Sequence, residues 1–322
     1  MTFKELEIIR KTYQKKVSKL YKIFIIIGAV LSAAILIPSI ITCIRLSDAK
    51  YLLFAIFPIF FIATILIIIA VLATHITASK DYDDYKKAYK AYFVSKSLAS
   101  TFVNLTYSRD AGLPKEILDI TNMIDTGDYY DSNDFVSGEY KDVSFVQADV
   151  CIKKEEKSTD SNGNTTTTYV TTFKGRWMIF EFPKKFDFRL EIASKDFVSN
   201  RVPGSTLSKT TRKFQKIAVE SIDFNKQFEI YAEDGMEAFY ILDPAFIEKI
   251  QKLKEDLNAP ILLCFIDSKL HVGVCDKKDA FEPPKPSKPI DEKAEFKKVN
   301  TDIKVITKFI DNLNLNKKIF KK

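Results

Sequence analysis

Histidine and cysteine are scarce in this chain of 322 residues, which has two His and four Cys. The four cysteines, Cys43, Cys151, Cys264 and Cys275, include no CxxC pair, so the sequence predicts neither a disulfide framework nor a zinc site. Cysteines of this kind are typical of a reducing compartment, where they behave as small buried hydrophobes.

The glycines of a phosphate-binding loop are also missing. Residues 201–212 superficially resemble such a loop, but Lys209 stands where its second glycine would be and Thr210 where its lysine would be. Without these glycines the backbone amides cannot converge on an anion. The segment is therefore either a plain solvated loop or a basic one that contacts an anionic surface such as lipid headgroups, through Arg201, Lys209, Arg212 and Lys213.

Acidic pairs occur at Asp83 with Asp84 and at Glu233 with Asp234, but neither has a recognisable paired-carboxylate spacing. The first pair precedes Lys87 by four and three residues, which is typical of a solvated helix face. The second is interpreted as a turn that includes Gly235. No metal site and no cofactor are predicted from these patterns.

Two long uncharged runs, Ile23–Ile44 and Tyr51–Ser79, lie on either side of the short segment 45–50. Each is long enough to cross a bilayer as a helix. A cleaved signal peptide would have a shorter apolar region, and a buried pair of core helices would be apolar on one stripe only. The sequence predicts a transmembrane hairpin with spans at 23–44 and 51–76.

The charges beside these runs predict the orientation. Seven Lys and Arg precede the first run and five lie between residues 80 and 96, whereas the connecting segment has two. Short flanks rich in Lys and Arg stay in the cytoplasm. We therefore expect an inner-membrane protein with two spans, a tight outer turn at 45–50 and both termini in the cytoplasm, with the lipid bilayer as its first partner.

The same flanks account for the net charge of +7. Residues 1–96 carry 14 Lys and Arg against 6 Asp and Glu, and the rest of the chain carries 35 against 36. A nucleic-acid-binding protein concentrates its basic residues on a face of the folded domain, so a nucleic-acid partner is not expected.

Helical periodicity continues beyond both spans. Apolar residues of the basic segment 1–22 recur every three or four positions, and so do the tyrosines of a predicted stalk helix at 77–110. If the two helices remain antiparallel, Tyr82 lies near Tyr13 and Tyr89 near Leu6. The tyrosine stripe is interpreted as a packing seam rather than as a platform for stacking a ligand.

A cytoplasmic α+β domain with a mainly antiparallel sheet is predicted at 111–282. Its expected helices are Leu113–Ile124 and Asp243–Leu257, and its expected strands are Val143–Ile152, Thr168–Phe173, Trp177–Phe182, Phe186–Ile192, Ile217–Phe224, Phe228–Ala232, Ile261–Ile266 and Leu270–Cys275. The last two strands are expected to form a hairpin around Asp267 and Ser268. Residues 153–166 are expected at a flexible hairpin tip.

Four prolines at 283–290 predict an extended linker. A C-terminal segment at 291–322 then shows the pattern of an amphipathic helix with a basic end. We expect this helix to dock on the sheet or the stalk; binding to a membrane surface or a partner is the alternative.

Cys264 and His271 are the candidate catalytic pair. In the expected hairpin they would face each other, with Cys275 on the same face, as a nucleophile with its base or as metal ligands. No orienting carboxylate or fourth ligand is visible, and Leu262 and Ile266 share that face. Core packing is the competing interpretation.

Phe228–Ile250, Ile261–Gly273 and Thr172–Arg176, together with the two apolar runs, resemble the bacterial family known as domain of unknown function 3137. The resemblance implies a membrane-anchored bacterial protein without an established activity, so no site residue is transferred. Gly235 and Met236 stand where that family is expected to have a more polar dipeptide, and His271 stands where it usually has a bulky residue.

Two functional hypotheses follow. The first is a non-enzymatic binding or scaffold module at the inner face of the membrane, with a membrane-protein partner or a second copy as its ligand. The second is an enzyme that acts on a membrane-proximal substrate through Cys264 and His271. The first is preferred, because catalysis requires converging groups that the sequence does not display.

Overall fold

The computed structural model describes residues 1–46, 50–161, 163–199 and 215–315. The basic-loop candidates Arg201, Lys209, Arg212 and Lys213 lie outside the described residues. The chain forms two compact units, one made of Met1–Tyr92 with Pro283–Glu292 and the other of Phe93–Glu282 with Lys293–Lys322.

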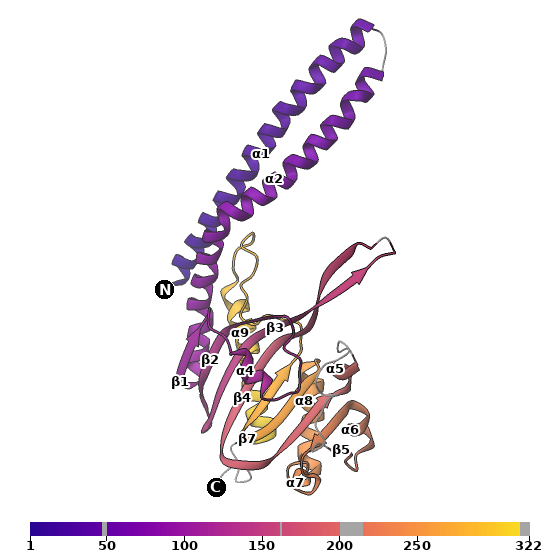
Figure 1. Ribbon diagram of the computed structural model, residues 1–322. Helices are drawn as coiled ribbons and strands as arrows, with labels where there is room; N and C mark the ends of the chain where they lie inside the picture. Colours follow the sequence, from indigo (N-terminus) through magenta and orange to yellow (C-terminus); the bar gives the residue numbers. More distant parts are fainter. Residues whose placement is uncertain (47–49, 162, 200–214, 316–322) are drawn as a thin grey trace. The chain divides into compact units, whose positions relative to one another are not determined.

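The first unit is an antiparallel pair of helices, α1 (Phe3–Leu46) and α2 (Lys50–Tyr89) (Figure 1). The rings of Tyr13 and Tyr82 lie 5.6 Å apart, so the predicted pairing of these two tyrosines is confirmed. Tyr85 and Tyr89 are fully buried, as is Leu6. In the part of the stalk that the structure describes, the tyrosine stripe is therefore a packing seam.

The apolar part of α1 qualifies as a membrane span by length and composition, and its most apolar stretch is not buried inside the protein. For α2 the same criterion is met only when Ala63–Thr74 and Ile76–Thr101 are taken together as one span bent by 41°. Helix α1 is therefore a candidate membrane span by its length and composition.

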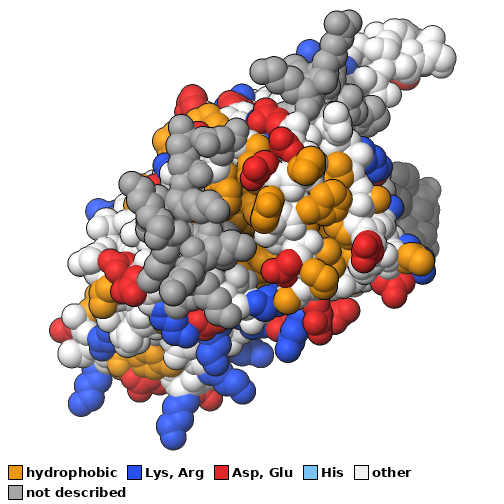
Figure 2. Space-filling view, turned by 90° about the horizontal axis from the view of Figure 1, so that it is seen from below, with side chains coloured by type: hydrophobic (Ala, Val, Ile, Leu, Met, Phe, Trp, Pro, Cys, Tyr) orange, Lys and Arg blue, Asp and Glu red, His pale blue; other side chains and the backbone are white. Residues whose placement is uncertain are grey.

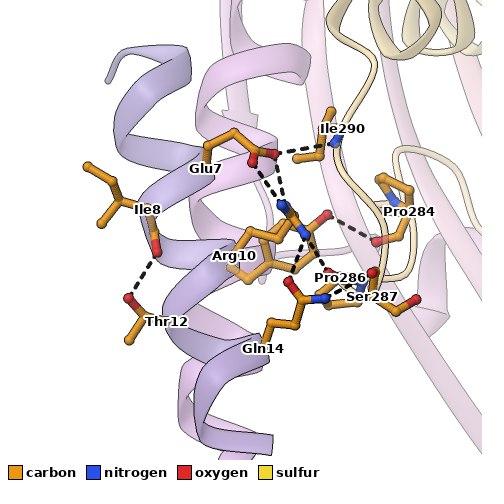
Figure 3. Close-up of polar contacts among 10 residues, drawn as sticks. Glu7, Ile8, Arg10, Thr12, Gln14, Pro284, Pro286, Ser287 and Ile290 are labelled. Carbon is orange, nitrogen blue, oxygen red and sulfur yellow. Dashed lines mark hydrogen bonds and ion pairs between the residues drawn. The ribbon is translucent and has the colours of Figure 1, made fainter. Parts of the chain in front are cut away.

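The proline-rich segment 283–292 is a strap that packs on this helical pair (Figure 3). Arg10 donates to the carbonyl oxygen of Pro286 at 2.8 Å, and Gln14 donates to that of Ser287 at 3.0 Å. The Tyr85 hydroxyl donates to the carbonyl oxygen of Pro284 at 3.0 Å. The segment lacks regular structure, as predicted, but it is held by specific hydrogen bonds and is not a free linker.

Replacing Arg10 by Ala should release the strap. Arg10 is buried and fixed by Glu7, whose carboxylate accepts from its guanidinium at 2.9 Å, so the change removes the donor to Pro286 and leaves Glu7 partly buried without its cation. Limited proteolysis of the full chain should then cut 283–292 at least several times faster. The control variant Lys11→Ala removes a neighbouring exposed charge and should be cut at the same rate as the wild type. If Arg10→Ala is also cut at the wild-type rate, Arg10 does not hold the strap.

The second unit is an α+β domain with a seven-stranded antiparallel sheet. A π-helical turn, Lys90–Val94, connects α2 to the first helix of this domain, α3 (Ser95–Thr101). Its strands are β1 (Val103–Ser108), β2 (Tyr129–Tyr140), β3 (Val143–Thr159), β4 (Thr165–Ser194), β5 (Gln215–Ile217), β6 (Phe228–Ala232) and β7 (Ile261–Val274), and its helices are α3 (Ser95–Thr101), α4 (Lys115–Asp119), α5 (Lys195–Ser199), α6 (Ile222–Gln227), α7 (Gly235–Ile241), α8 (Pro244–Leu257) and α9 (Glu292–Leu313).

The strand order is β1-β2-β3-β4-β6-β5, and β7 also pairs with β4. The 30-residue strand β4 therefore organises the sheet, because it is paired with β3, β6 and β7. Three strands predicted separately, at 168–173, 177–182 and 186–192, are parts of this single strand.

The structure corrects several expected boundaries. The stalk helix predicted to 110 ends at Thr101, and Val103–Ser108 is a strand. The expected hairpin at Asp267 and Ser268 is wrong: Ile261–Val274 is one strand, since both of its halves pair with β4. The strand expected at 217–224 is instead the short β5 followed by α6, and the helix expected at 113–124 is reduced to α4.

Helices cover both faces of the sheet. Alternate strand residues place Phe180 and Phe265 on one face, where Phe180 packs on Phe309 of α9 and Phe265 on Phe246 of α8. The predicted docking of the C-terminal helix on the sheet is therefore confirmed. Residues of α4 and α5 pack on the other face, around the fully buried Trp177.

Candidate functional site

A groove in the second unit is lined by the segment 218–221 that leads into α6, by α7 and by α8. Each of these three helices begins at a side chain that accepts hydrogen bonds from the first-turn amides, namely Ser221, Asp234 and Asp243. Such N-caps stabilise helix starts by about 1 kcal/mol each. The loop before α6 is also fixed, because the Asn225 amide bonds both backbone groups of Val219. The groove is therefore a locally defined feature.

Helix α7 has two different faces. Ala238 and Ile241 are buried, whereas Met236, Phe239 and Tyr240 are 82%, 49% and 74% exposed. Residues three and four apart share one side of a helix, so the three exposed side chains form one apolar surface. Large apolar side chains gathered in this way on a soluble domain mark interaction sites more often than isolated ones do.

Beside this surface lies a groove of about 860 Å³. It is lined by Ala218, Val219, Glu220, Ser221, Phe239, Leu242, Pro244, Ile247, Glu248 and Gln251. Figure 2 shows hydrophobic side chains gathered on the face seen from below, with both acidic and basic side chains around them. Six of the ten residues that line the groove are apolar, namely Ala218, Val219, Phe239, Leu242, Pro244 and Ile247.

The charged residues that line the groove are acidic, namely Glu220 and Glu248. Along the sequence, residues 218–251 contain eight Asp and Glu against two Lys. Lys226, one of the two lysines, pairs with Asp223 at 3.1 Å. An apolar floor with an acidic rim is complementary to a ligand that has an apolar face and positive charges. We call these features, together with the exposed face of α7, the acidic-rimmed groove.

The sequence-based candidates Cys264 and His271 lie elsewhere, in the body of the sheet. They are seven positions apart on β7, and they pair with Glu191 and Ile179 of β4 rather than with each other. Cys264 is fully buried within the apolar cluster around Trp177, and Cys275 packs at its edge. His271 is buried as well, and its Nδ1 accepts from the Trp177 indole at 3.5 Å.

The protonation of these groups disfavours nucleophilic chemistry. Burial raises the pKa of the Cys264 thiol to about 12, and burial lowers the pKa of His271 to about 4. The nucleophile of cysteine catalysis is the thiolate, which requires the opposite shift. Cys264 and His271 therefore have the properties of core residues.

The buried His271 predicts a pH dependence of stability. Its folded pKa of about 4 lies below the ordinary 6.5, so the unfolded chain binds a proton first as the pH falls. The stabilising contribution is complete above pH 6.5 and is lost as the pH falls from 6.5 through 4. At 1.36 kcal/mol per pKa unit the loss is about 3 kcal/mol.

The single tryptophan, Trp177, gives the readout, because it is buried beside His271. Urea unfolding of the full chain in detergent, followed by Trp177 fluorescence, should show this loss between pH 7 and 4. The variant His271→Gln should show a clearly shallower dependence in the same window. Identical pH dependences for the two proteins would contradict a buried neutral histidine.

The acidic-rimmed groove was not predicted from the sequence, because residues 233–235 were interpreted as a turn. One signal was available: Asp234 precedes Glu237 by three residues, the spacing of a helix capping box. In the structure Asp234 indeed accepts from the amides of Met236 and Glu237, at 2.8 and 3.1 Å. This spacing predicts the helix α7, but it does not predict which side of that helix is exposed.

Fold and groove together define an α+β protein with an N-terminal apolar helix and an exposed apolar surface beside a groove. Residues 171–315 match the family described as protein of unknown function (DUF3137), so the resemblance to this family is confirmed for that segment. It includes the groove, β7 and α9.

A comparison with curated proteins gave no match. Among solved structures, the chain is similar to the mycobacterial trehalose monomycolate transport factor A, TtfA, with 8% identity and a TM-score of 0.37. That alignment covers 71% of this chain and 94% of the other.

Proposed function

We propose that the protein is a membrane-anchored, non-catalytic binding module that receives a basic amphipathic helix of a protein partner in its acidic-rimmed groove. The observation that carries the proposal is the exposed apolar face of α7 beside a groove with an acidic rim. Helices with apolar side chains at positions i, i+3, i+4 and i+7 bind in grooves of this kind.

The acidic rim selects among possible occupants. A lipid tail would satisfy the apolar floor but gains nothing from Glu220 and Glu248, and anionic headgroups would be repelled by them. A helix with Lys and Arg on its polar face is complementary in charge to the acidic rim. The same rim repels acidic competitors. A nucleic acid is disfavoured for the same reason.

The anchor in this proposal is the two-helix hairpin with spans at 23–44 and 51–76, both termini in the cytoplasm and the turn 45–50 outside the inner membrane. Its support is the apolar helix α1, the bent second helix and the Lys and Arg on the flanks. This topology would hold the groove at the cytoplasmic surface, where a membrane-protein partner can present a juxtamembrane helix.

Topology is tested by cysteine labelling in intact cells. A membrane-impermeant maleimide should label a Lys50→Cys variant from outside, and it should label Lys96→Cys only after the cells are broken. The wild type provides the background from its native cysteines. External labelling at position 96, or none at position 50, would contradict the proposed orientation.

Binding is tested with a matched pair of peptides that share one apolar helical face and carry either Lys or Glu on the other. The full chain in neutral-lipid nanodiscs should bind the Lys peptide, with an affinity that falls as salt increases. Empty nanodiscs correct for binding to lipid. Equal binding of the two peptides, or binding of neither, would contradict the proposal, and self-association of the chain in place of binding would identify a second copy as the occupant.

A further inference from the structure

One side of helix α1 carries a row of exposed lysines just before its apolar stretch. Four lysines recur at intervals of four, four and three residues, namely Lys11, Lys15, Lys19 and Lys22. This spacing places them on one side of the helix. Together with Gln14 and Ser18 they line an open groove of about 460 Å³. Tyr13, which packs on Tyr82 of α2, lies on the other side of α1, so this lysine row faces away from α2.

The carboxylates beside the lysine row are bound to other cations. Asp81 pairs with Lys16, which lies outside the row, and Glu7 accepts from the guanidinium of Arg10 at 2.9 Å. Within the part of the chain that the structure describes, Lys15, Lys19 and Lys22 form no ion pair. These three ammonium groups are therefore available to an anionic ligand.

The lysine row ends where the apolar stretch of α1 begins. Ile26 and Val30 follow Lys22 on the same side of the helix at intervals of four residues, and they are 62% and 63% exposed. A ligand that is complementary to this whole side has negative charge at one end and apolar chains at the other. Free phosphate would use the lysines alone, whereas an anionic phospholipid would use both parts.

The dimensions of a bilayer select the lysines that can reach a headgroup. We take Ile23 as the first residue of the span and α1 as lying along the bilayer normal. At a rise of 1.5 Å per residue, Lys22 and Lys19 then lie about 1.5 and 6 Å from Ile23, within a polar layer about 5–8 Å thick. Lys15 lies about 12 Å away and reaches this layer only with an extended side chain, and Lys11, about 18 Å away, does not reach it.

We propose that Lys19 and Lys22 bind the phosphate headgroup of an anionic phospholipid whose acyl chains lie against Ile26 and Val30. The inference rests on the membrane anchor of the proposed function and adds a lipid selectivity to it. It uses no residue of the acidic-rimmed groove. Each lysine near an anionic membrane surface strengthens binding about fivefold, so the two together are expected to favour an anionic over a zwitterionic lipid about tenfold or more.

The test is native mass spectrometry of the full chain in a neutral detergent, titrated with phosphatidylglycerol or with phosphatidylcholine of the same acyl chains. Phosphatidylglycerol should bind about tenfold or more tightly than phosphatidylcholine. The double variant Lys19→Gln with Lys22→Gln should remove this preference, whereas Lys11→Gln should keep most of it. The replaced side chains are exposed, so the variants are expected to fold.

The matched control is Lys297→Gln with Lys304→Gln, which removes two exposed lysines of α9 and should keep the preference. Equal binding of the two lipids to the wild type, or an equal loss in the control, would overturn the proposal. Loss of the preference in millimolar inorganic phosphate at constant ionic strength would overturn it as well, because the lysines would then be a site for free phosphate.

The cysteine labelling of the anchor separates this inference from the proposed function. If the labelling matches the predicted topology while the two lipids bind equally, the lipid site alone is excluded. If the labelling contradicts the hairpin, the anchor and the lipid site fail together.

Discussion

Replacing Phe239 by Asp should weaken the binding of a basic amphipathic peptide about thirtyfold or more while leaving the fold intact. Phe239 lines the groove and is 49% exposed, so it offers apolar area to a ligand. Central aromatic residues of an interface typically contribute 2 kcal/mol or more, and 1.4 kcal/mol corresponds to a factor of ten in affinity. Substitution of a surface residue usually changes stability by no more than about 0.5 kcal/mol.

Two further variants test whether the loss of binding is specific to the groove. Met236→Asp, on the same face of α7, should show a similar loss. Tyr169→Asp alters an equally exposed aromatic side chain on the hairpin of β4, away from the groove, and should bind like the wild type. An unchanged affinity in Phe239→Asp, with the protein folded, would exclude the groove as the binding site.

The largest expected loss of stability is at Arg176. Its buried guanidinium donates to both the backbone carbonyl and the side chain of Asp302, so it joins β4 to α9. The variant Arg176→Met leaves Asp302 and the buried Asp149 without their cation. Breaking a buried ion pair in this way costs about 3–5 kcal/mol.

Urea unfolding of the full chain, followed by Trp177 fluorescence, measures this cost. Lys216→Met removes a cation of similar chain length from a more exposed pair with Glu229, 2.6 Å away, and should cost less than about 1 kcal/mol. The double variant Arg176→Met with Asp302→Leu should recover part of the loss. A loss in Arg176→Met no greater than that in Lys216→Met would contradict the role of Arg176 in joining sheet and helix.

Local sequence signals correctly predicted the helices whose buried face coincides with the pattern of apolar residues in their own sequence. Helix α8 begins at Asp243 and Pro244, and its predicted apolar residues, among them Phe246 and Leu253, are buried. Helix α9 likewise buries Val299, Ile303 and Ile306. In α8 the N-terminal signal, the periodicity and the buried face agree, and in α9 the periodicity and the buried face agree. Local sequence and tertiary contacts therefore favour the same structure in both helices.

Prediction failed where distant pairing decides the structure. Asp267 has the positive φ of a turn residue, 54°, but the chain continues as a strand because Asp267 pairs with Phe186 of β4. This single error placed Cys264 opposite His271. Strand β2 was missed because polar residues dominate it, and only its sheet partners define it. Strand β1 alternates apolar and polar residues, but it was included in the stalk helix predicted at 77–110.

The groove was not predicted from the sequence for a related reason. It depends on α7, a helix of only seven residues whose apolar side is exposed rather than buried. Which side of this helix is exposed follows from the tertiary arrangement, which the spacing of residues within one segment does not encode.

Photo-cross-linking from position 240 in native membranes tests the central claim most directly. A benzophenone side chain in place of Tyr240, which is 74% exposed beside the groove, should form an adduct with one partner segment, whereas the same group at position 169 should not. Mass spectrometry should identify that segment as a helix with apolar residues at helical spacing and Lys or Arg between them. Adducts with acidic or irregular segments, or the same adducts from both positions, would contradict the account.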